Sequence, residues 1–168
     1  MSTDINDRAA VEERLWKEID KAHYGMLGLV GTEPAQHFQP MTAFTDDVAG
    51  RIYFFTRKTT DIARDAGSGH QAMLVIQAKD RELQACIGGQ LSAGRDQAVI
   101  DRFWGPVVAA WFPEGKEDAN LCVLTFRPDD AQIWISDQGP VKFGWEIAKA
   151  NATGKEPDVG GKAHIDLH

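Results

Sequence analysis

The stretch RIYFFTRKTTDIARD, residues 51–65, holds the clearest structural pattern in the chain. Its first half alternates two sets of side chains and is rich in aromatic and β-branched residues, which predicts a strand. A short helix is expected directly after it, with Thr59 or Thr60 as its N-cap. The apolar side of that helix would consist of Ile62, Ala63 and Ala66.

The turn at residues 57–60 is suited to a phosphate group. Backbone N–H groups at a helix start, threonine hydroxyls and positive charge all meet there. Residues 51–64 are basic although the whole chain is acidic, with Arg51, Arg57, Lys58 and Arg64 against Asp61. One interpretation is an anionic small ligand. The other is that the cations at 57 and 58 merely solvate a turn after an edge strand, and this stretch alone leaves both open.

Length and charge limit the possible classes of protein. The chain has 168 residues and a formal net charge of −7, which predicts one domain with a single core. This charge does not favour nucleic acid or an anionic membrane as partner. No apolar run approaches the ~20 residues of a membrane helix, and the polar N-terminus indicates a cytoplasmic protein. Cys86 and Cys122 have no cysteine or histidine nearby at ligand spacing, which favours reduced thiols. The histidines are scattered, so the sequence does not favour a metal site.

Short strands joined by turns predict an antiparallel barrel within one domain, residues 1–168. The Gly88-Gly89 pair indicates a bulge or a sharp bend inside one strand. Helices are expected at 7–22, at 96–112 with a break at 105–106, and at 143–150, so that the N-terminal helix falls within 1–23. Further strands are expected at 26–30, 38–45, 72–78, 83–93, 121–126 and 132–135, with a turn at 127–130 between the last two. The tail, 151–168, is expected to be rich in loop, with an edge strand at 164–167.

A second stretch, FWGPVVAAWFPEGKEDANL at residues 103–121, connects the chain to a known family. Its large aromatic residues taken alone are equally compatible with a plain core. However, the stretch resembles the signature of bacterial general stress proteins in the pyridoxamine 5′-phosphate oxidase-like superfamily. The resemblance implies an α+β, mainly β fold: an antiparallel split β-barrel with flanking helices, which binds FMN. The residues in register are Trp104, Pro106, Ala110, Trp111, Phe112, Pro113, Gly115 and Asp118.

The same resemblance implies a set of cofactor-binding residues. They come from several separate strands and from the aromatic stretch, and Trp134 would be contributed by a partner subunit in a homodimer. Two arguments therefore meet at the turn after residue 56, one from phosphate chemistry and one from the family. The implied cofactor-binding residues are Gln39, Pro40, Met41, Thr42, Phe55, Thr56, Arg57, Lys58, Thr59, Thr60, Gln84, Trp111, Phe112 and Trp134.

Two positions depart from the family pattern. Gln39 stands where an arginine is common, and Ile62 stands where relatives have a lysine that reaches the phosphate. Each charge-assisted bond lost weakens phosphate binding by ~1.5–3 kcal/mol. Arg57, Lys58 or Arg64 would have to compensate. FMN is the expected cofactor, with FAD as the alternative.

Three functions remain open from the sequence. The first is a flavin-dependent oxidoreductase that exchanges hydride with a nicotinamide or another small organic substrate. The second is a flavin-binding module without turnover, since no general acid or base stands out. The third is a flavin-free interaction dimer, prompted by the two missing cations. Pyridoxamine 5′-phosphate oxidase activity itself is not expected, because no counterpart of that enzyme's C-terminal arginine and histidine motif follows Ile135.

Overall fold

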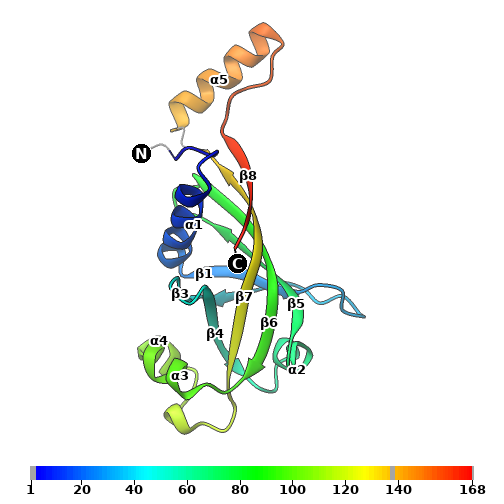
Figure 1. Cartoon of the computed structure of the whole chain (residues 1–168), viewed down its shortest axis with the longest axis vertical. Coiled ribbons are helices and arrows are strands. Elements are labelled where there is room, and N and C mark those ends of the chain that lie inside the picture. The colour runs from blue at the N-terminus through cyan, green and yellow to red at the C-terminus, as the bar shows by residue number, and fades with distance from the viewer. Residues whose placement is uncertain (1–2, 137–138, 168) are drawn as a thin grey trace.

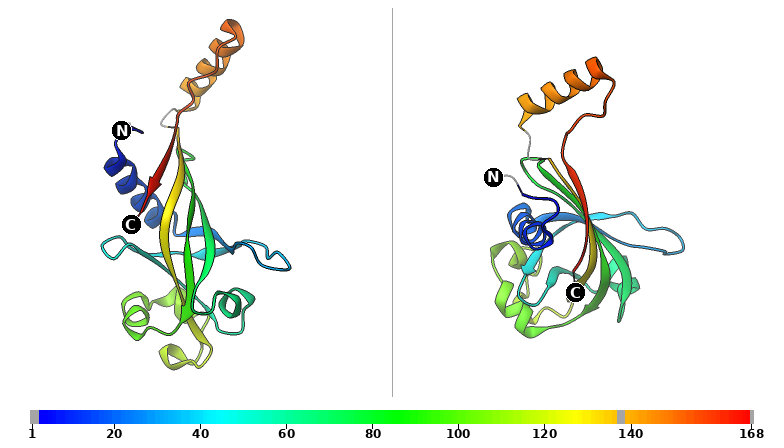
Figure 2. Two further views of the ribbon diagram at one scale, coloured as in Figure 1. Left: turned by 45° about the vertical axis from the view of Figure 1, so that its right-hand side comes forward. Right: turned by 45° about the horizontal axis from the view of Figure 1, so that its top comes forward.

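The computed structural model describes residues 3–136 and 139–167, and its centre is one curled antiparallel sheet (Figure 1). Helices lie around the sheet rather than between its strands, in the α+β arrangement of a split barrel (Figure 2). The fold class predicted from the sequence is therefore confirmed. The helices are α1 (Arg8–Ala22), α2 (Asp61–Ala66), α3 (Gln97–Phe103), α4 (Pro106–Ala109) and α5 (Pro140–Thr153). The strands are β1 (Tyr24–Leu29), β2 (Gln39–Thr42), β3 (Phe44–Asp46), β4 (Arg51–Arg57), β5 (His70–Gln77), β6 (Leu83–Gly94), β7 (Leu121–Ile135) and β8 (Gly161–Asp166).

The order of the strands explains why the barrel is split. The sheet runs β2-β1-β5-β6-β7-β4-β3, and β8 adds to the second half of β7. The strands β2 and β3 follow each other in sequence but lie at opposite ends of this order. Pro40 lies in β2, an edge strand of the sheet, where a missing N–H is tolerated. The barrel therefore stays open between β2 and the β3–β4 pair.

The strand β7 runs the length of the molecule and corrects one prediction. The expected turn at 127–130 does not form, and two expected strands are one strand of 15 residues. The cause lies in the neighbouring strand, where the register shifts between Gly88 and Gly89. Gly88 pairs with Asp130 and Gly89 with Pro128, so the bulge accommodates the proline inside a continuous ladder. The predicted bulge is confirmed, and it takes the place of the predicted turn.

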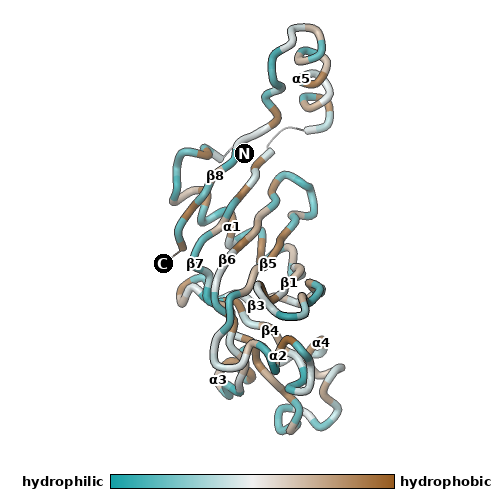
Figure 3. Tube along the Cα trace, turned by 90° about the vertical axis from the view of Figure 1, so that its right-hand side faces the viewer, coloured by the Kyte–Doolittle hydropathy of each residue, from teal (hydrophilic) through white to brown (hydrophobic). Residues whose placement is uncertain are grey.

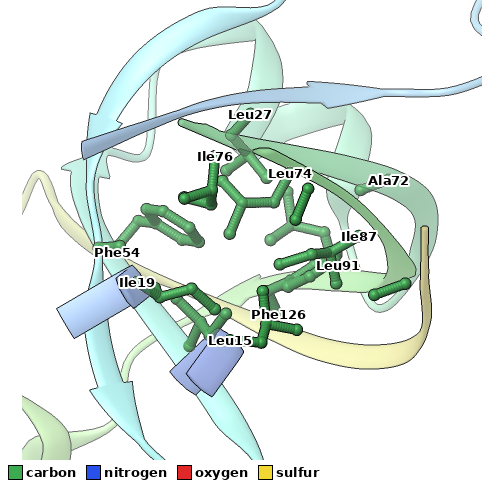
Figure 4. Packing of buried hydrophobic residues seen from close by; sticks show 14 of the residues in the cluster. Leu15, Ile19, Leu27, Phe54, Ala72, Leu74, Ile76, Ile87, Leu91 and Phe126 are labelled. Atoms are coloured by element: carbon green, nitrogen blue, oxygen red, sulfur yellow. The ribbon is translucent and has the colours of Figure 1, made fainter. Parts of the chain in front are cut away.

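The main core lies between α1 and the inner face of the sheet (Figure 4). Asp7 caps α1 by accepting a hydrogen bond from the backbone N–H of Ala10 at 3.1 Å. The buried side of α1, with Leu15 and Ile19, packs against leucine, isoleucine and phenylalanine side chains of the strands. Each fully buried side chain of this kind contributes about 1.5–3 kcal/mol relative to exposure. The inward-facing residues of the strands include Leu27, Phe54, Leu74, Ile76, Leu83, Ile87, Leu91 and Phe126.

A second, smaller core lies under α3 and α4 at one end of the barrel. Asp96 caps α3 by accepting from the backbone N–H of Val99 at 3.2 Å, and Pro106 starts α4 after the predicted break. The buried residues of this core are Val99, Ile100, Val108, Phe112, Leu121 and Val123. They hold α4 against the start of β7 and the β3–β4 pair, which fixes one wall of the site described below.

The C-terminal elements extend beyond the barrel. The helix α5 is longer than predicted at both ends and stands away from the sheet at the end opposite α3 and α4 (Figures 1 and 2). The predicted C-terminal edge strand is confirmed as β8, which begins three residues earlier than expected, at Gly161. Within residues 3–136 and 139–167, no helix has the length and apolar character that crossing a membrane requires.

Candidate functional site

A cavity of about 310 Å³ lies at the split of the barrel. Three elements bound it: the edge strand β2, the end of β4 with the turn that follows, and α4 with the residues after it. An edge strand presents unpaired backbone donors and acceptors, which a planar heterocycle can use. The residues that line the cavity are Pro40, Met41, Thr42, Phe44, Phe55, Thr56, Arg57, Thr60, Val107, Val108, Trp111 and Phe112.

The polar end of the cavity is formed by the turn after β4. The hydroxyl oxygens of Thr56 and Thr60 lie 3.3 Å apart. Thr60 occupies the N-cap position of α2, but its hydroxyl donates to the carbonyl of Arg57 at 2.9 Å instead of capping the helix. Thr56, Arg57 and Thr60 all line this end of the cavity, and the Thr60 hydroxyl would turn its single proton from the carbonyl of Arg57 to a bound anion.

Arg57 links this turn to the opposite wall. Its Nη2 donates to the backbone carbonyl of Trp111 at 3.4 Å, and no ion pair of Arg57 occurs among the described residues. Arg64, in contrast, is already paired with Asp61 one helical turn away. Of the two arginines that flank the turn, Arg57 thus has the guanidinium that is free for a bound anion.

The remaining wall is apolar and aromatic. Phe44 and Phe55 pack edge to face with ring centroids 5.3 Å apart, which fixes the ring of Phe55 at the cavity floor. Phe112 is buried in the smaller core behind it. Val107 and Trp111, one helical turn apart, are 60% and 67% exposed and form the rim. A flat ring system can therefore enter between the aromatic wall and the edge strand.

Lys58 belongs to a different hollow. Lys58, in the turn directly after β4, lines a separate space of about 300 Å³ together with Arg95 and Cys122. Burial raises the pKa of the Cys122 thiol. Ile62, where relatives have a lysine, is buried in the main core with the rest of the inner side of α2. Position 62 therefore offers the cavity no cation.

Ionisable chemistry is sparse in the cavity. Of the described residues that line it, Arg57 alone has an ionisable side chain. Behind the aromatic wall, burial raises the pKa of Tyr53, whose ring lies beside that of Phe103. Within the described part of the chain no group of three histidine, cysteine, aspartate or glutamate side chains has a metal-binding arrangement. The arrangement can hold and orient a ligand, and its own groups offer little for proton transfer.

The structure brings together most of the residues predicted for the site. Gln39 and Thr59 are chain neighbours of lining residues but do not line the cavity, and Lys58 faces the other hollow. Gln84 and Trp134 are paired with each other near the start of β6 and the end of β7, whereas the turn after β4 lies beside the start of β7. The predicted residues that do line the cavity are Pro40, Met41, Thr42, Phe55, Thr56, Arg57, Thr60, Trp111 and Phe112.

Three lining residues escaped the sequence analysis: Phe44, Val107 and Val108. The two valines were detectable, because they precede Trp111 by four and three residues on a helical stretch and so share its side. Phe44 carries no such signal. Phe44 is distant in sequence from the turn after β4. It reaches the cavity because β3 pairs with β4, which places Phe44 opposite Tyr53 in the sheet.

Comparison with known proteins defines the class. The profile of the family described as "Pyridoxamine 5′-phosphate oxidase like" matches residues 10–158. The chain therefore belongs to the pyridoxamine 5′-phosphate oxidase-like family, and the family predicted from residues 103–121 is confirmed. A search of curated proteins finds no match.

Several solved structures of general stress proteins are similar to this chain. The general stress FMN/FAD binding protein of Xanthomonas citri is 38% identical, with 78% of this chain and 92% of that chain covered and a TM-score of 0.71. A general stress family protein of Xanthomonas campestris pv. campestris is 37% identical, with 79% and 92% covered and a TM-score of 0.72. A general stress protein 26 of Jannaschia sp. CCS1 is 34% identical, with 94% and 99% covered and a TM-score of 0.78.

Proposed function

We propose that this protein is a cytoplasmic stress protein that binds FMN in the cavity at the split of the barrel. The observation that carries the proposal is the division of the cavity into two ends. Thr56, Thr60 and Arg57 form a polar, cationic end, and an aromatic wall faces an edge strand at the other. A flavin nucleotide has the same division, with a phosphate at one end and a flat apolar ring at the other. The similarity to an FMN/FAD binding relative supports the same cofactor class.

The roles of the chain's residues follow from this placement. The hydroxyls of Thr56 and Thr60 and the guanidinium of Arg57 would hold the phosphate, and the backbone of β2 would bond the edge of the ring. Trp111 would cover one face of the ring and exclude water from it. A bound flavin supplies hydride transfer, whereas the protein supplies binding, orientation and a dry environment.

The proposal includes a homodimer with two equivalent sites, each receiving Trp134 from the partner. Its support is the outer face of the sheet, where Met26 of β1 and Val75 of β5 are neighbours in register and both exposed. Tyr24, two residues before Met26 on the same face of β1, extends this exposed apolar surface. The exposed Trp134 lies on the same face of the sheet, in the row of Gln77 and Gln84. Contiguous exposed apolar surface of this kind marks interfaces, and an isologous dimer covers it on both copies at once.

The test of binding is a fluorescence titration of the flavin-free protein with FMN and, separately, with FAD. We expect saturation with one FMN per chain and weaker binding of FAD. The variant Arg57→Gln should lose about tenfold or more in FMN affinity, because a charge-assisted bond is worth ~1.5–3 kcal/mol. The variant Arg64→Gln is the matched control, since that guanidinium is paired with Asp61. Equal losses in the two variants would contradict the placement of the phosphate.

For the reaction, we propose an oxidoreductase that exchanges hydride between FMN and a nicotinamide or another small organic substrate. A second candidate is a flavin carrier or sensor without turnover. The observation in its favour is that Arg57 is the one ionisable side chain among the described residues that line the cavity. Anaerobic mixing with NADH or NADPH separates the two: bleaching of the flavin band within seconds supports the enzyme, and a band that persists for hours supports the carrier.

A further inference from the structure

Arg57 connects the two walls of the cavity. It is the last residue of β4, and its backbone is held by pairing with Leu121 at the start of β7. Its Nη2 donates to the backbone carbonyl of Trp111, which follows α4 on the opposite wall. Figure 3 shows α4 near β4, in the half of the molecule away from α5. A single side chain therefore joins the polar end of the cavity to its aromatic rim.

The side chain of Trp111 is exposed at the rim and belongs to neither core. Within the part of the chain that the structure describes, no other aromatic ring and no cation packs against its indole. Its backbone N–H donates to the carbonyl of Val108 at 3.0 Å, which is a local bond of the turn after α4. Its carbonyl is bound by Arg57. The place of the indole over the cavity therefore depends on a backbone that Arg57 links to β4.

The guanidinium of Arg57 can bind an anion and keep this bond. It carries several N–H donors in one plane. Among the described residues it makes one side-chain hydrogen bond, from Nη2 to Trp111. An edge with two parallel donors remains for two oxygens of one phosphate. Thr56 and Thr60 line the same end of the cavity, which is where the proposed function places the phosphate.

A bound phosphate restricts the guanidinium, and through it the carbonyl of Trp111. The side chain of Arg57 is exposed and has several rotatable bonds, so a single contact with a neutral carbonyl leaves it much of its freedom. A phosphate dianion holds a guanidinium more firmly than a neutral carbonyl does. The first ligand then bears the cost of ordering the rim, and a ring that enters afterwards does not.

We infer that Arg57 is a positioning residue for Trp111 and couples occupation of the polar end to the placement of the aromatic rim. This inference rests on the proposed placement of a phosphate beside Thr56 and Thr60. The two ends of the cavity then bind cooperatively, so that inorganic phosphate in the polar end raises the affinity for a flavin ring that carries no phosphate. The chain thereby selects a flavin nucleotide over riboflavin by more than the phosphate contacts alone provide. The coupling is reciprocal, because it acts equally in both directions.

The variant Arg57→Lys separates positive charge from positioning. An ammonium keeps the charge at the polar end, but it is a point charge and lacks the planar fork that holds a carbonyl and a phosphate together. The variant therefore retains attraction for phosphate and loses the link to Trp111. The matched control is Arg64→Lys, because the guanidinium of Arg64 is paired with Asp61 and does not line the cavity.

The coupling is measured by titrating riboflavin into the flavin-free protein with and without saturating inorganic phosphate, at constant ionic strength. We expect phosphate to lower the dissociation constant of riboflavin about fivefold or more in the wild type and in Arg64→Lys. In Arg57→Lys the constant should stay within a factor of two. A wild-type constant that does not change, or that rises on addition of phosphate, would overturn the inference. Coupling that survives in Arg57→Lys would overturn it as well.

The response of the rim is followed without flavin by ¹⁹F NMR of protein labelled with fluorotryptophan. The Trp111 signal is assigned by its absence from Trp111→Phe, and Trp16, which packs against the main core from α1, is the internal reference. We expect inorganic phosphate to shift the Trp111 signal in the wild type but not in Arg57→Lys, and to leave the Trp16 signal in place. A Trp111 signal that ignores phosphate, in a protein that binds FMN, would refute the coupling and leave the proposed function intact. A wild type that binds no flavin would refute the proposed function, and the fluorine signal would then decide the coupling alone.

Discussion

The hydroxyls of Thr56 and Thr60 are the smallest features on which phosphate binding depends. They lie 3.3 Å apart at the polar end of the cavity, and the backbone carbonyl of Arg57 orients the second of them. Thr59, between them in sequence, does not line the cavity. Thr59 can therefore serve as the control for the loss of a threonine hydroxyl at this turn.

We predict that Thr60→Val weakens FMN binding about tenfold, because it removes one hydrogen bond to a charged group, worth ~1.5–3 kcal/mol, without changing the shape of the side chain. Titration of the variant with FMN gives the dissociation constant. Thr59→Val should leave the constant within a factor of two. If both variants bind FMN as the wild type does, the phosphate lies elsewhere.

Residue by residue, the site was predictable where local pattern and chemistry coincide. The turn from Thr56 to Thr60 has hydroxyls, charge and a helix start in one short stretch, and the structure places its key members in the cavity. Lys58 shows the limit, because its neighbours in sequence do not reveal to which side of the chain a turn residue points. Phe44 shows another limit, since only strand pairing brings it to the site.

At the scale of elements, the bulge between β6 and β7 keeps the longest ladder continuous across Pro128. Gly89 is the residue that permits it: a Cβ there would lie 2.2 Å from the backbone carbonyl oxygen of Arg127. The glycine pair in the sequence indicated the irregularity in β6, but it did not show that β7 continues through residues 127–130. The residues at 127–130 have turn chemistry, and only the partner strand shows that they continue a ladder.

We predict that Gly89→Ala lowers the free energy of unfolding by about 1–3 kcal/mol, because the added methyl group overpacks against backbone that cannot yield cheaply. Gly94→Ala on the same strand is the control, since a Cβ there meets no atom within 4 Å. Urea unfolding at neutral pH measures both. Equal stability of the two variants would mean that the bulge relaxes without cost.

The contact between the β3–β4 turn and α3 gives a pH-dependent prediction. The backbone N–H of Ala49, 3.0 Å away, and the guanidinium of Arg102, 2.5 Å away, hold the pKa of Asp46 below its usual value of 3.8. A lowered pKa in the folded state means that this stabilisation is present above about pH 4 and is lost as the pH falls through the folded-state value.

We therefore expect Asp46→Asn to be less stable than wild type at pH 7, by about 1 kcal/mol for the weakened hydrogen bonds. The difference should shrink as the pH is lowered below 4, because the wild-type carboxyl then becomes protonated. Unfolding curves at a series of pH values test this. The exposed neighbour Asp47 provides the control, and Asp47→Asn should show no such convergence.

On the scale of the whole molecule, one chain forms a stable barrel but leaves two apolar surfaces uncovered. One is the outer face of the sheet around Met26 and Val75, and the other consists of the exposed apolar side chains of α5. The barrel follows from strand patterns that can be read locally, so its class was predictable. The position of α5 outside the barrel was not, because the sequence of an amphipathic helix does not show whether its own chain or a partner covers it.

We predict that Val75→Lys raises the dissociation constant of the dimer at least tenfold, because it places a charge within the outer apolar face of the sheet. Sedimentation velocity over a range of concentrations measures the constant. Val48→Lys changes an exposed valine in a turn and should leave it unaltered. A wild-type protein that sediments as a monomer at all concentrations would exclude the dimer.

The central claim is that this protein carries FMN. Its most direct test is the visible absorption spectrum of the natively purified protein, followed by mass identification of the chromophore that denaturation releases. The account predicts a visible flavin band that survives desalting, with FMN as the released compound at about one per chain. A colourless protein that also fails to bind added FMN or FAD would contradict the account, and the cavity at the split of the barrel would then need another ligand.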